Sequence, residues 1–246
     1  MQASPSLRVL GLTFLSFFAT SSFASSNNDG VDTNLVAFYT GTDSSYFMSG
    51  ELHSVASYKS GKMEGQYQLW YESGEKWFEG TFKDGRPYNV LTEFYQDGSR
   101  KMEIFRKDDE ERTTAWYENG NPSYLMEFVN GLPDKKHMYW YPNGNLKLES
   151  HFLRGQRTGV WSHFSSEGVL IKREHYENNV LLLEENYHGG VMHGAYNAWY
   201  PGGYLRVTGM YVGNAKHGKW KYYNPAGKLI REEQYVGGKM TSAKDL

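Results

Sequence analysis

The sequence contains no cysteine among its 246 residues. This absence excludes disulfide bonds, zinc–thiolate sites, iron–sulfur clusters, thiol catalysis and the acylated cysteine of a bacterial lipoprotein. No apolar run after residue 24 approaches the ~18 residues of a membrane-spanning helix. The 26 basic and 28 acidic residues nearly balance, so the chain lacks the positive charge typical of nucleic-acid-binding proteins, and we expect no nucleic-acid partner.

Enzyme motifs are also missing. The sequence has no Gly-x-Ser-x-Gly elbow and no glycine-rich phosphate loop that precedes a helix. The acidic run at residues 108–111 lacks the alternating spacing and the glycine of a calcium loop, and we predict a solvated charged loop at 106–112. Glu184 and Glu185 are adjacent and therefore lie on opposite faces of a strand, unlike a glycosidase pair. We expect no catalytic residues and no cofactor.

The first 24 residues have the pattern of an export signal. Arg8 supplies a positive charge, residues 9–19 form an apolar run, and Ser22 and Ala24 occupy the −3 and −1 positions of a cleavage site. The alternative is a buried N-terminal helix, which the short and uncapped run disfavours. The sequence therefore predicts an exported protein, periplasmic or secreted, that is cleaved after Ala24.

A repeat is visible in the glycines of the remaining chain. It aligns on Gly50, Gly74, Gly98, Gly120, Gly144, Gly168, Gly203 and Gly227, at spacings of 24, 24, 22, 24, 24, 35 and 24 residues. An aromatic residue stands four positions before each of these glycines, and another usually stands eight positions after. In the shortened unit Phe105 takes the second position one residue early. Such a register over most of the chain indicates a repeat protein.

Each unit has the signature of a β-hairpin. Short runs rich in Trp, Tyr and Phe flank turns such as Tyr141-Pro142-Asn143-Gly144, which favour a type I turn closed by a glycine bulge. Turn residues recur every ~11–12 positions, which leaves no room for a stable helix. The predicted fold class is all-β: an elongated single-layer antiparallel sheet of tandem β-hairpin repeats with a period of about 24 residues.

Two places interrupt the period: the charged segment 106–112 and 11 extra residues at 179–189, which we interpret as an extra strand that reverses or bends the array. The predicted organisation is a signal peptide at 1–24, an N-terminal segment with a degenerate first repeat at 25–49, repeats at 50–178, the extra strand at 179–189, further repeats at 190–240 and a tail at 241–246.

The turn type predicts which residues share a face of the sheet. Residues four before, two after and eight after each glycine recur, so we assign them to the packed face; residues that vary between units fall on the opposite face. Tyrosine and tryptophan offer large, rigid contact areas, which makes the variable face the candidate binding surface. Its candidate binding residues are Tyr67, Tyr71, Tyr95, Tyr117, Tyr139, Trp161, Tyr196, Trp220 and Tyr222. The alternative is that these rings shield one another along cross-strand ladders.

Three histidines raise the question of a metal site. His151, His163 and His175 are spaced by 12 residues, and the predicted register places His163 and His175 on one face. Three imidazoles within reach would suit zinc or nickel. We favour the alternative, exposed and unconnected histidines, because no carboxylates that would orient them are evident. No metal is therefore expected.

The segment Gly218–Leu229 reads Gly-Lys-Trp-Lys-Tyr-Tyr-Asn-Pro-Ala-Gly-Lys-Leu and resembles the MORN repeat in its bacterial variant form. The segments 65–85, 159–168 and 194–203 resemble it almost as well. The resemblance implies stacked β-hairpins without intrinsic enzymatic activity. Bacterial members are often labelled antitoxin components of toxin–antitoxin systems, and eukaryotic MORN arrays are linked to membrane attachment and scaffolding.

These observations predict a non-enzymatic, exported repeat protein that mediates protein–protein interaction in the cell envelope, as a scaffold or as an immunity factor similar to an antitoxin. The alternative is a module that binds cell-wall glycan or a membrane surface with the same aromatic residues. The sequence leaves the partner and the oligomeric state open.

Overall fold

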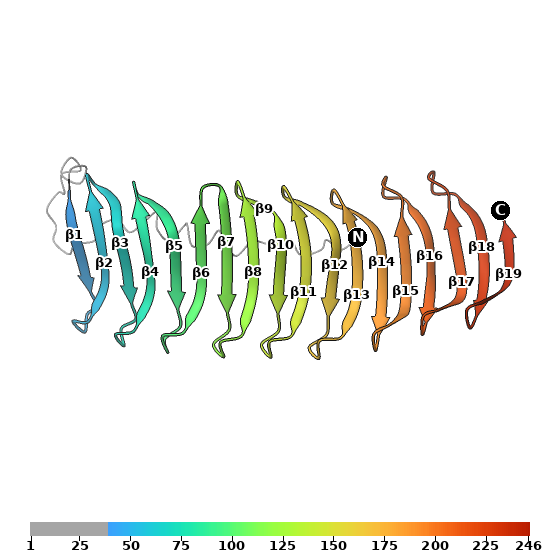
Figure 1. Ribbon diagram of the computed structural model, residues 1–246, viewed down its shortest axis with the longest axis horizontal. Helices are drawn as coiled ribbons and strands as arrows, with labels where there is room; N and C mark the ends of the chain where they lie inside the picture. Colours follow the sequence, from blue (N-terminus) through green and yellow to red (C-terminus); the bar gives the residue numbers. More distant parts are fainter. Residues whose placement is uncertain (1–38) are drawn as a thin grey trace.

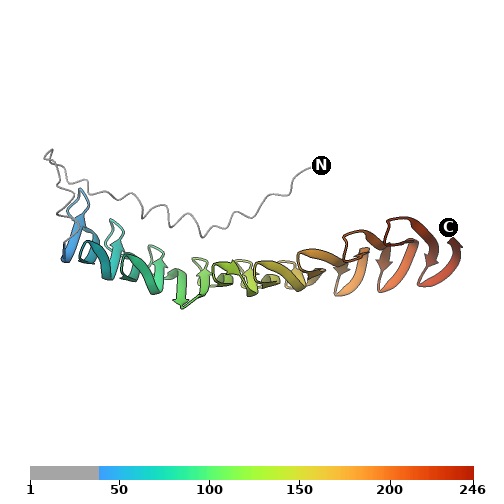
Figure 2. The same ribbon diagram turned by 90° about the horizontal axis from the view of Figure 1, so that it is seen from above.

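The computed structural model describes residues 39–246, which form one open antiparallel sheet of 19 strands (Figure 1). Each strand except β9 pairs with the next in sequence; β9 pairs with β8, which also pairs with β10. Figure 2 shows a single layer that curves along its length. Within these residues no helix is long and apolar enough to cross a membrane. The predicted fold class is confirmed, whereas the predicted signal peptide lies outside the described residues.

The strands are β1 (Gly41–Tyr46), β2 (Leu52–Lys59), β3 (Lys62–Trp70), β4 (Lys76–Lys83), β5 (Arg86–Phe94), β6 (Arg100–Lys107), β7 (Glu110–Trp116), β8 (Pro122–Val129), β9 (Leu132–Pro133), β10 (Lys135–Trp140), β11 (Leu146–Leu153), β12 (Gln156–Phe164), β13 (Leu170–Glu177), β14 (Val180–His188), β15 (Val191–Trp199), β16 (Leu205–Val212), β17 (Ala215–Tyr223), β18 (Leu229–Val236) and β19 (Lys239–Asp245).

Two kinds of turn connect the strands. In the long turns the repeat glycine closes the loop: Gly74, at φ +95°, donates its N–H to the Tyr71 carbonyl, and Tyr71 donates to the Glu75 carbonyl. The short turns have two central residues, such as Asn130 and Gly131 at φ +52° and +73°, which are the values of a type I′ turn. The turn predicted from the repeat glycine is confirmed.

A second irregularity follows each long turn and changes the faces. Trp70 pairs with Lys76, as the predicted register requires, but Leu69 pairs with Phe78 because a bulge intervenes. The same shift occurs at every long turn between residues 39 and 246. One extra residue moves all later side chains of that strand to the other face. The predicted assignment of faces is therefore wrong: residues seven and five before the glycine share the packed face with those four, six and eight after it.

The most apolar part of the packed face lies on β3 to β5. Leu69, Phe78, Phe82 and Leu91 are buried there, and Tyr67 packs against them. Because the sheet has one layer, these side chains are covered only by their neighbours along the sheet. Burial of each large apolar side chain contributes about 1.5–3 kcal/mol. The core of this protein is thus a row of side chains along one face.

The charged segment 106–112 is not the loop that we predicted. Strand β6 extends to Lys107 and β7 begins at Glu110, which leaves a turn of only Asp108 and Asp109. The β6–β7 pair has no bulge, so both strands run in register to this turn. The charges are accommodated in pairs on the strands, for example Arg106 with Glu111 at 2.6 Å.

Strand β14 occupies the 11-residue insertion and reverses the array. The turn before it, Asn178-Asn179, and the turn after it, Gly189-Gly190, are both short, whereas elsewhere short and long turns alternate. The long turns therefore lie along one long edge of the sheet up to β13 and along the other edge after β14 (Figure 1). We call β1–β13 the N-terminal block and β15–β19 the C-terminal block.

The same strand also exchanges the faces. Glu174, on the packed face of the N-terminal block, pairs with Glu184, and Glu184 pairs with Asn197. Tyr196 neighbours Asn197 on β15 and so lies on the other face, where its ring centroid is 5.3 Å from that of Trp220. A single inserted strand reverses every later strand while the sheet advances in the same direction, so the later hairpins are rotated by half a turn. The two blocks therefore pack their rings on opposite faces.

Candidate interaction surface

Three of the predicted binding residues begin long turns. Tyr71, Tyr95 and Tyr117 each donate the hydroxyl hydrogen to a backbone carbonyl of the following hairpin unit, at 2.8 Å in all three cases. Tyr141 and Tyr200, which were not in the predicted set, do the same at 3.0 and 2.9 Å. These half-buried tyrosines connect consecutive units, and their hydroxyls are already engaged within the protein.

The other predicted binding residues lie on the packed faces rather than on a free face. They are Tyr67, Tyr139, Trp161, Tyr196, Trp220 and Tyr222. Trp220 is only 1% exposed and the others are half-buried. Their prediction as a freely exposed surface is wrong, because the bulge after each long turn was not foreseen. The alternative that rings shield one another across strands describes this face.

A continuous ladder of rings shows this shielding. From β8 to β13, centroids of Phe128, His137, Phe152, Trp161 and Tyr176 follow one another at 5.4, 4.6, 5.2 and 5.1 Å. His137 Nε2 donates to a backbone carbonyl of β8 at 2.7 Å. Burial lowers the pKa of His137, so the imidazole is neutral at neutral pH.

The three spaced histidines do not share a face. His163 lies on the packed face, where its Nε2 is 2.9 Å from a Glu174 carboxylate oxygen. His175 neighbours Glu174 on β13 and lies on the opposite face, so the predicted register is wrong here for the reason given above. His151 and His175 each contact a different glutamate, at 3.3 and 3.8 Å. Between residues 39 and 246 no group of three or more histidine or acidic side chains is placed to hold a metal ion.

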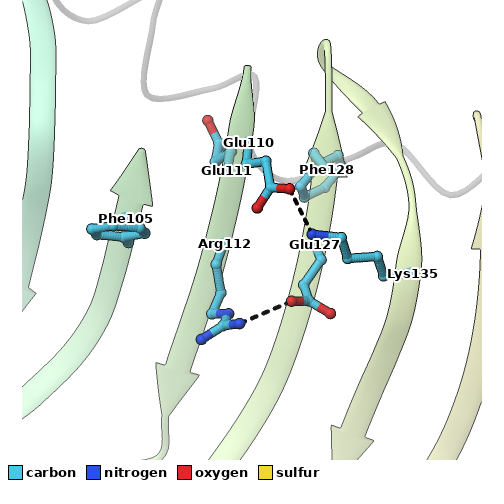
Figure 3. Close-up of a pocket in the computed structure, with 7 residues that line it drawn as sticks. All are labelled: Phe105, Glu110, Glu111, Arg112, Glu127, Phe128 and Lys135. Carbon is cyan, nitrogen blue, oxygen red and sulfur yellow. Dashed lines mark hydrogen bonds and ion pairs between the residues drawn. The ribbon is translucent and has the colours of Figure 1, made fainter. Parts of the chain in front are cut away.

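A hollow of about 90 Å³ lies along β6 to β10, and part of its lining comes from the face opposite the packed face of the N-terminal block, which we call the open face (Figure 3). It is lined by Phe105, Glu110, Glu111, Arg112, Glu127, Phe128 and Lys135. Across four strands, Val90 pairs with Phe105, Phe105 with Arg112, and Arg112 with Glu127. This row of paired residues defines the candidate site.

The shortened repeat unit explains why Phe105 is there. Ile104 faces the core, and Phe105, its neighbour, therefore points to the open face, where it is 43% exposed. In the regular units the aromatic residue lies eight positions after the repeat glycine, one more than Phe105, and belongs to the packed face, as Phe128 does. Our alignment placed Phe105 in that packed column, and this is wrong because the missing residue turns the ring over.

Two ion pairs frame the hollow. Arg112 Nη2 lies 3.1 Å from Glu127 Oε1, and Lys135 Nζ lies 2.9 Å from Glu110 Oε1 (Figure 3). The hydrogen bond to Glu110 raises the pKa of Lys135, which stays charged. Arg112 and Lys135 are exposed, and ion pairs that stay open to solvent are weak, so a partner can recruit these two positive charges at little cost. Val90, Arg112, Glu127 and Lys135 were not predicted as site residues; the only signal was the 22-residue spacing.

The geometry defines an open repeat sheet without a catalytic constellation among the described residues. Four segments match the family model of the MORN repeat variant: residues 63–84, 133–153, 157–178 and 216–236. Together they cover less than half of the chain, and the chain thus contains MORN repeat variants at these four places. No curated protein matches the sequence. MORN repeats generally take part in interactions with proteins or membrane surfaces and are typically not catalytic.

Proposed function

We propose that this chain is a non-enzymatic interaction protein that is exported to the cell envelope and binds another protein there, as a scaffold or an immunity factor similar to an antitoxin. The family of the four matched repeats supports the interaction role. The proposal of export rests on the apolar run at residues 9–19 and the cleavage pattern that ends at Ala24.

The observation that carries the proposal is the exposed Phe105 between Val90 and Arg112. Aromatic residues and arginine are enriched where protein partners bind, and they contribute most when a partner excludes water from them. Here both residue types lie side by side on adjacent strands, next to a hollow that holds about one side chain of a partner. The packed faces offer less, because their rings are covered by neighbouring rings.

A crosslinking pull-down from the envelope fraction of the producing cell tests this proposal. The bait is the mature chain from Ser25, compared with Phe105→Ala and with a matched control, Val160→Ala, on the open face of β12. Both substitutions are at exposed positions, so we expect both variants to fold. The wild type and the control should retain a protein that Phe105→Ala loses, with a drop in affinity of about tenfold or more.

Two results would contradict the proposal. Equal capture by all three baits would show that Phe105 is not part of the binding surface. If no bait captures a protein but the wild type sediments with cell wall or lipid vesicles, the protein binds glycan or a membrane surface instead.

A further inference from the structure

Two hairpin units carry the same charged arrangement on their packed faces. At matching distances from their turn glycines, Gly168 and Gly227, the two units place a cation, a tryptophan, a glutamate and a tyrosine: Arg157, Trp161, Glu174 and Tyr176 in one, and Lys216, Trp220, Glu233 and Tyr235 in the other. The unit of Gly74 has Met63, Tyr67, Gly80 and Phe82 at these positions. The hairpin itself therefore does not require the charges.

In the C-terminal block three rings surround one ammonium group. Lys216 Nζ lies 4.2 Å from the ring centroid of Trp220, 4.8 Å from that of Tyr235 and 5.7 Å from that of Tyr222. All three distances are within the ~6 Å range of cation–π attraction. Beside the rings, the Glu233 carboxylate accepts hydrogen bonds from Tyr222 and Tyr235 and adds negative charge. This group of rings, which we call the Lys216 cage, has the chemistry of a cation site.

Lys216 has few polar partners in this cage. Its Nζ donates one hydrogen bond, to the Tyr222 hydroxyl at 3.0 Å, and forms no ion pair within the described part of the chain. Arg157, its counterpart, also has one side-chain hydrogen bond, from its guanidinium to the Asn179 carbonyl at 3.4 Å, and its ring contacts are with Trp161 and Tyr176. The Lys216 ammonium is therefore held by the three rings and one hydroxyl, and not by a carboxylate of the described residues.

The tryptophans of the two units differ as well. Trp161 Nε1 donates to the His151 carbonyl at 3.1 Å. Trp220 Nε1 is buried and has no hydrogen-bond partner among residues 39–246. A buried donor without a partner destabilises a fold by about 1–3 kcal/mol. The protein bears this cost at Trp220, whose ring packs against those of Tyr196 and Tyr211. The unpartnered donor thus distinguishes the unit of Lys216 from that of Arg157.

We propose that the Lys216 cage is a binding site for a trimethylammonium group, such as that of choline, and that Lys216 is a resident occupant which the ligand displaces. A lysine ammonium is strongly hydrated, whereas a quaternary ammonium is the group that aromatic cages bind in other proteins. The site lies on the packed face of the C-terminal block, away from Phe105, so this proposal does not depend on the partner-binding site.

Calorimetric titration of the mature chain from Ser25 with choline chloride tests the proposal. Lys216→Ala removes the occupant, and choline should then bind about tenfold more tightly than to the wild type. Lys219→Ala removes an exposed lysine of the same strand and should bind like the wild type. Adding Tyr235→Leu to Lys216→Ala should abolish the gain. Sodium chloride at equal ionic strength controls for charge screening.

Vesicles of phosphatidylcholine or phosphatidylglycerol distinguish the sources of the ligand. Binding of free choline without vesicle binding assigns a soluble ligand, and preference for phosphatidylcholine vesicles assigns a lipid headgroup. If Lys216→Ala keeps the circular dichroism of the wild type but binds choline no better, the proposal is wrong. If that variant does not fold, Lys216→Gln, which keeps most of the side chain without the charge, is tested against the same criterion.

Discussion

The packing of Trp220 on Gly209 leads to a prediction whose size follows from the structure. A Cβ atom built on Gly209 would lie 2.2 Å from Trp220 Cδ2 and 2.3 Å from Cε2. Gly209 has no left-handed backbone, so a side chain here meets an obstacle in space and no strain in φ. Trp220 is 1% exposed and its ring contacts those of Tyr196 and Tyr211, which leaves it no free direction.

The substitution Gly209→Ala must therefore separate β16 from the indole by more than an ångström. Overpacking of this kind typically costs 1–3 kcal/mol, and the rigidity of the ring places this case near the upper end, about 3 kcal/mol. For a chain of this length that loss lowers Tm by about 6–12 °C. In Gly80→Ala the same clash meets Leu91 Cδ2 at 2.5 Å, the end of a flexible side chain, and we expect about half the loss.

Thermal unfolding followed by near-ultraviolet circular dichroism measures both effects, because the tryptophan signal reports on the ring stack. Gly202→Ala is the matched control: its Cβ would find Tyr204 Cδ2 at an ordinary 3.5 Å, and its φ is not left-handed. We expect this control to unfold within about 0.5 kcal/mol of the wild type. A Gly209→Ala variant with the wild-type Tm and an unchanged tryptophan signal would refute the packing argument.

Three further predictions concern hydrogen bonds and charge. Tyr117→Phe removes the donor to the Trp140 carbonyl and should cost about 1 kcal/mol in urea unfolding; no loss would show that the turn tyrosines do not connect the units. A hydrogen bond from a histidine lowers the pKa of Glu174 to about 2. At Glu233, burial raises the pKa, but hydrogen bonds from two tyrosines and an arginine outweigh it and lower the pKa to about 2. These carboxylates therefore stabilise the fold above their ordinary pKa of 4.5, and this stability is lost as pH falls towards 2; a Tm profile that stays flat over this range would contradict the shifts. Burial lowers the pKa of His137 below 6.5, so acidification from neutral pH to about pH 5 should destabilise the wild type, and the slope should be smaller in His137→Phe if the neutral imidazole is its source.

The turns of this protein could be predicted from sequence because glycine alone takes their backbone conformation without strain. Gly74 and its equivalents therefore fixed the hairpins, the strand count per unit and the single layer. The faces could not be predicted in the same way. The bulge at Leu69 and Trp70 involves neither glycine nor a positive φ, so no residue type marks it, yet it decides which side every later side chain of the strand takes.

The candidate site, too, could be predicted from the sequence only in part. The 22-residue spacing marks the unit of Phe105 as unusual in the sequence itself. Whether the missing residue buried the ring or exposed it depended on the absence of a bulge between β6 and β7, which only the pairing of Ile104 with Thr113 and Phe105 with Arg112 reveals. Likewise the pair of Lys135 with Glu110 joins β10 and β7, which belong to different hairpins.

Strand β14 gives the two sides of this sheet unequal chemistry along their length. A partner that lies flat on one side meets the open face over β1–β13 and then rings and charges over β15–β19, while on the other side it meets them in the reverse order. Insertion of a whole hairpin would only lengthen the array, and the packed face would then lie on the same side of the sheet along its whole length. Because the insertion is a single strand, each side of the sheet carries the open face of one block and the packed face of the other.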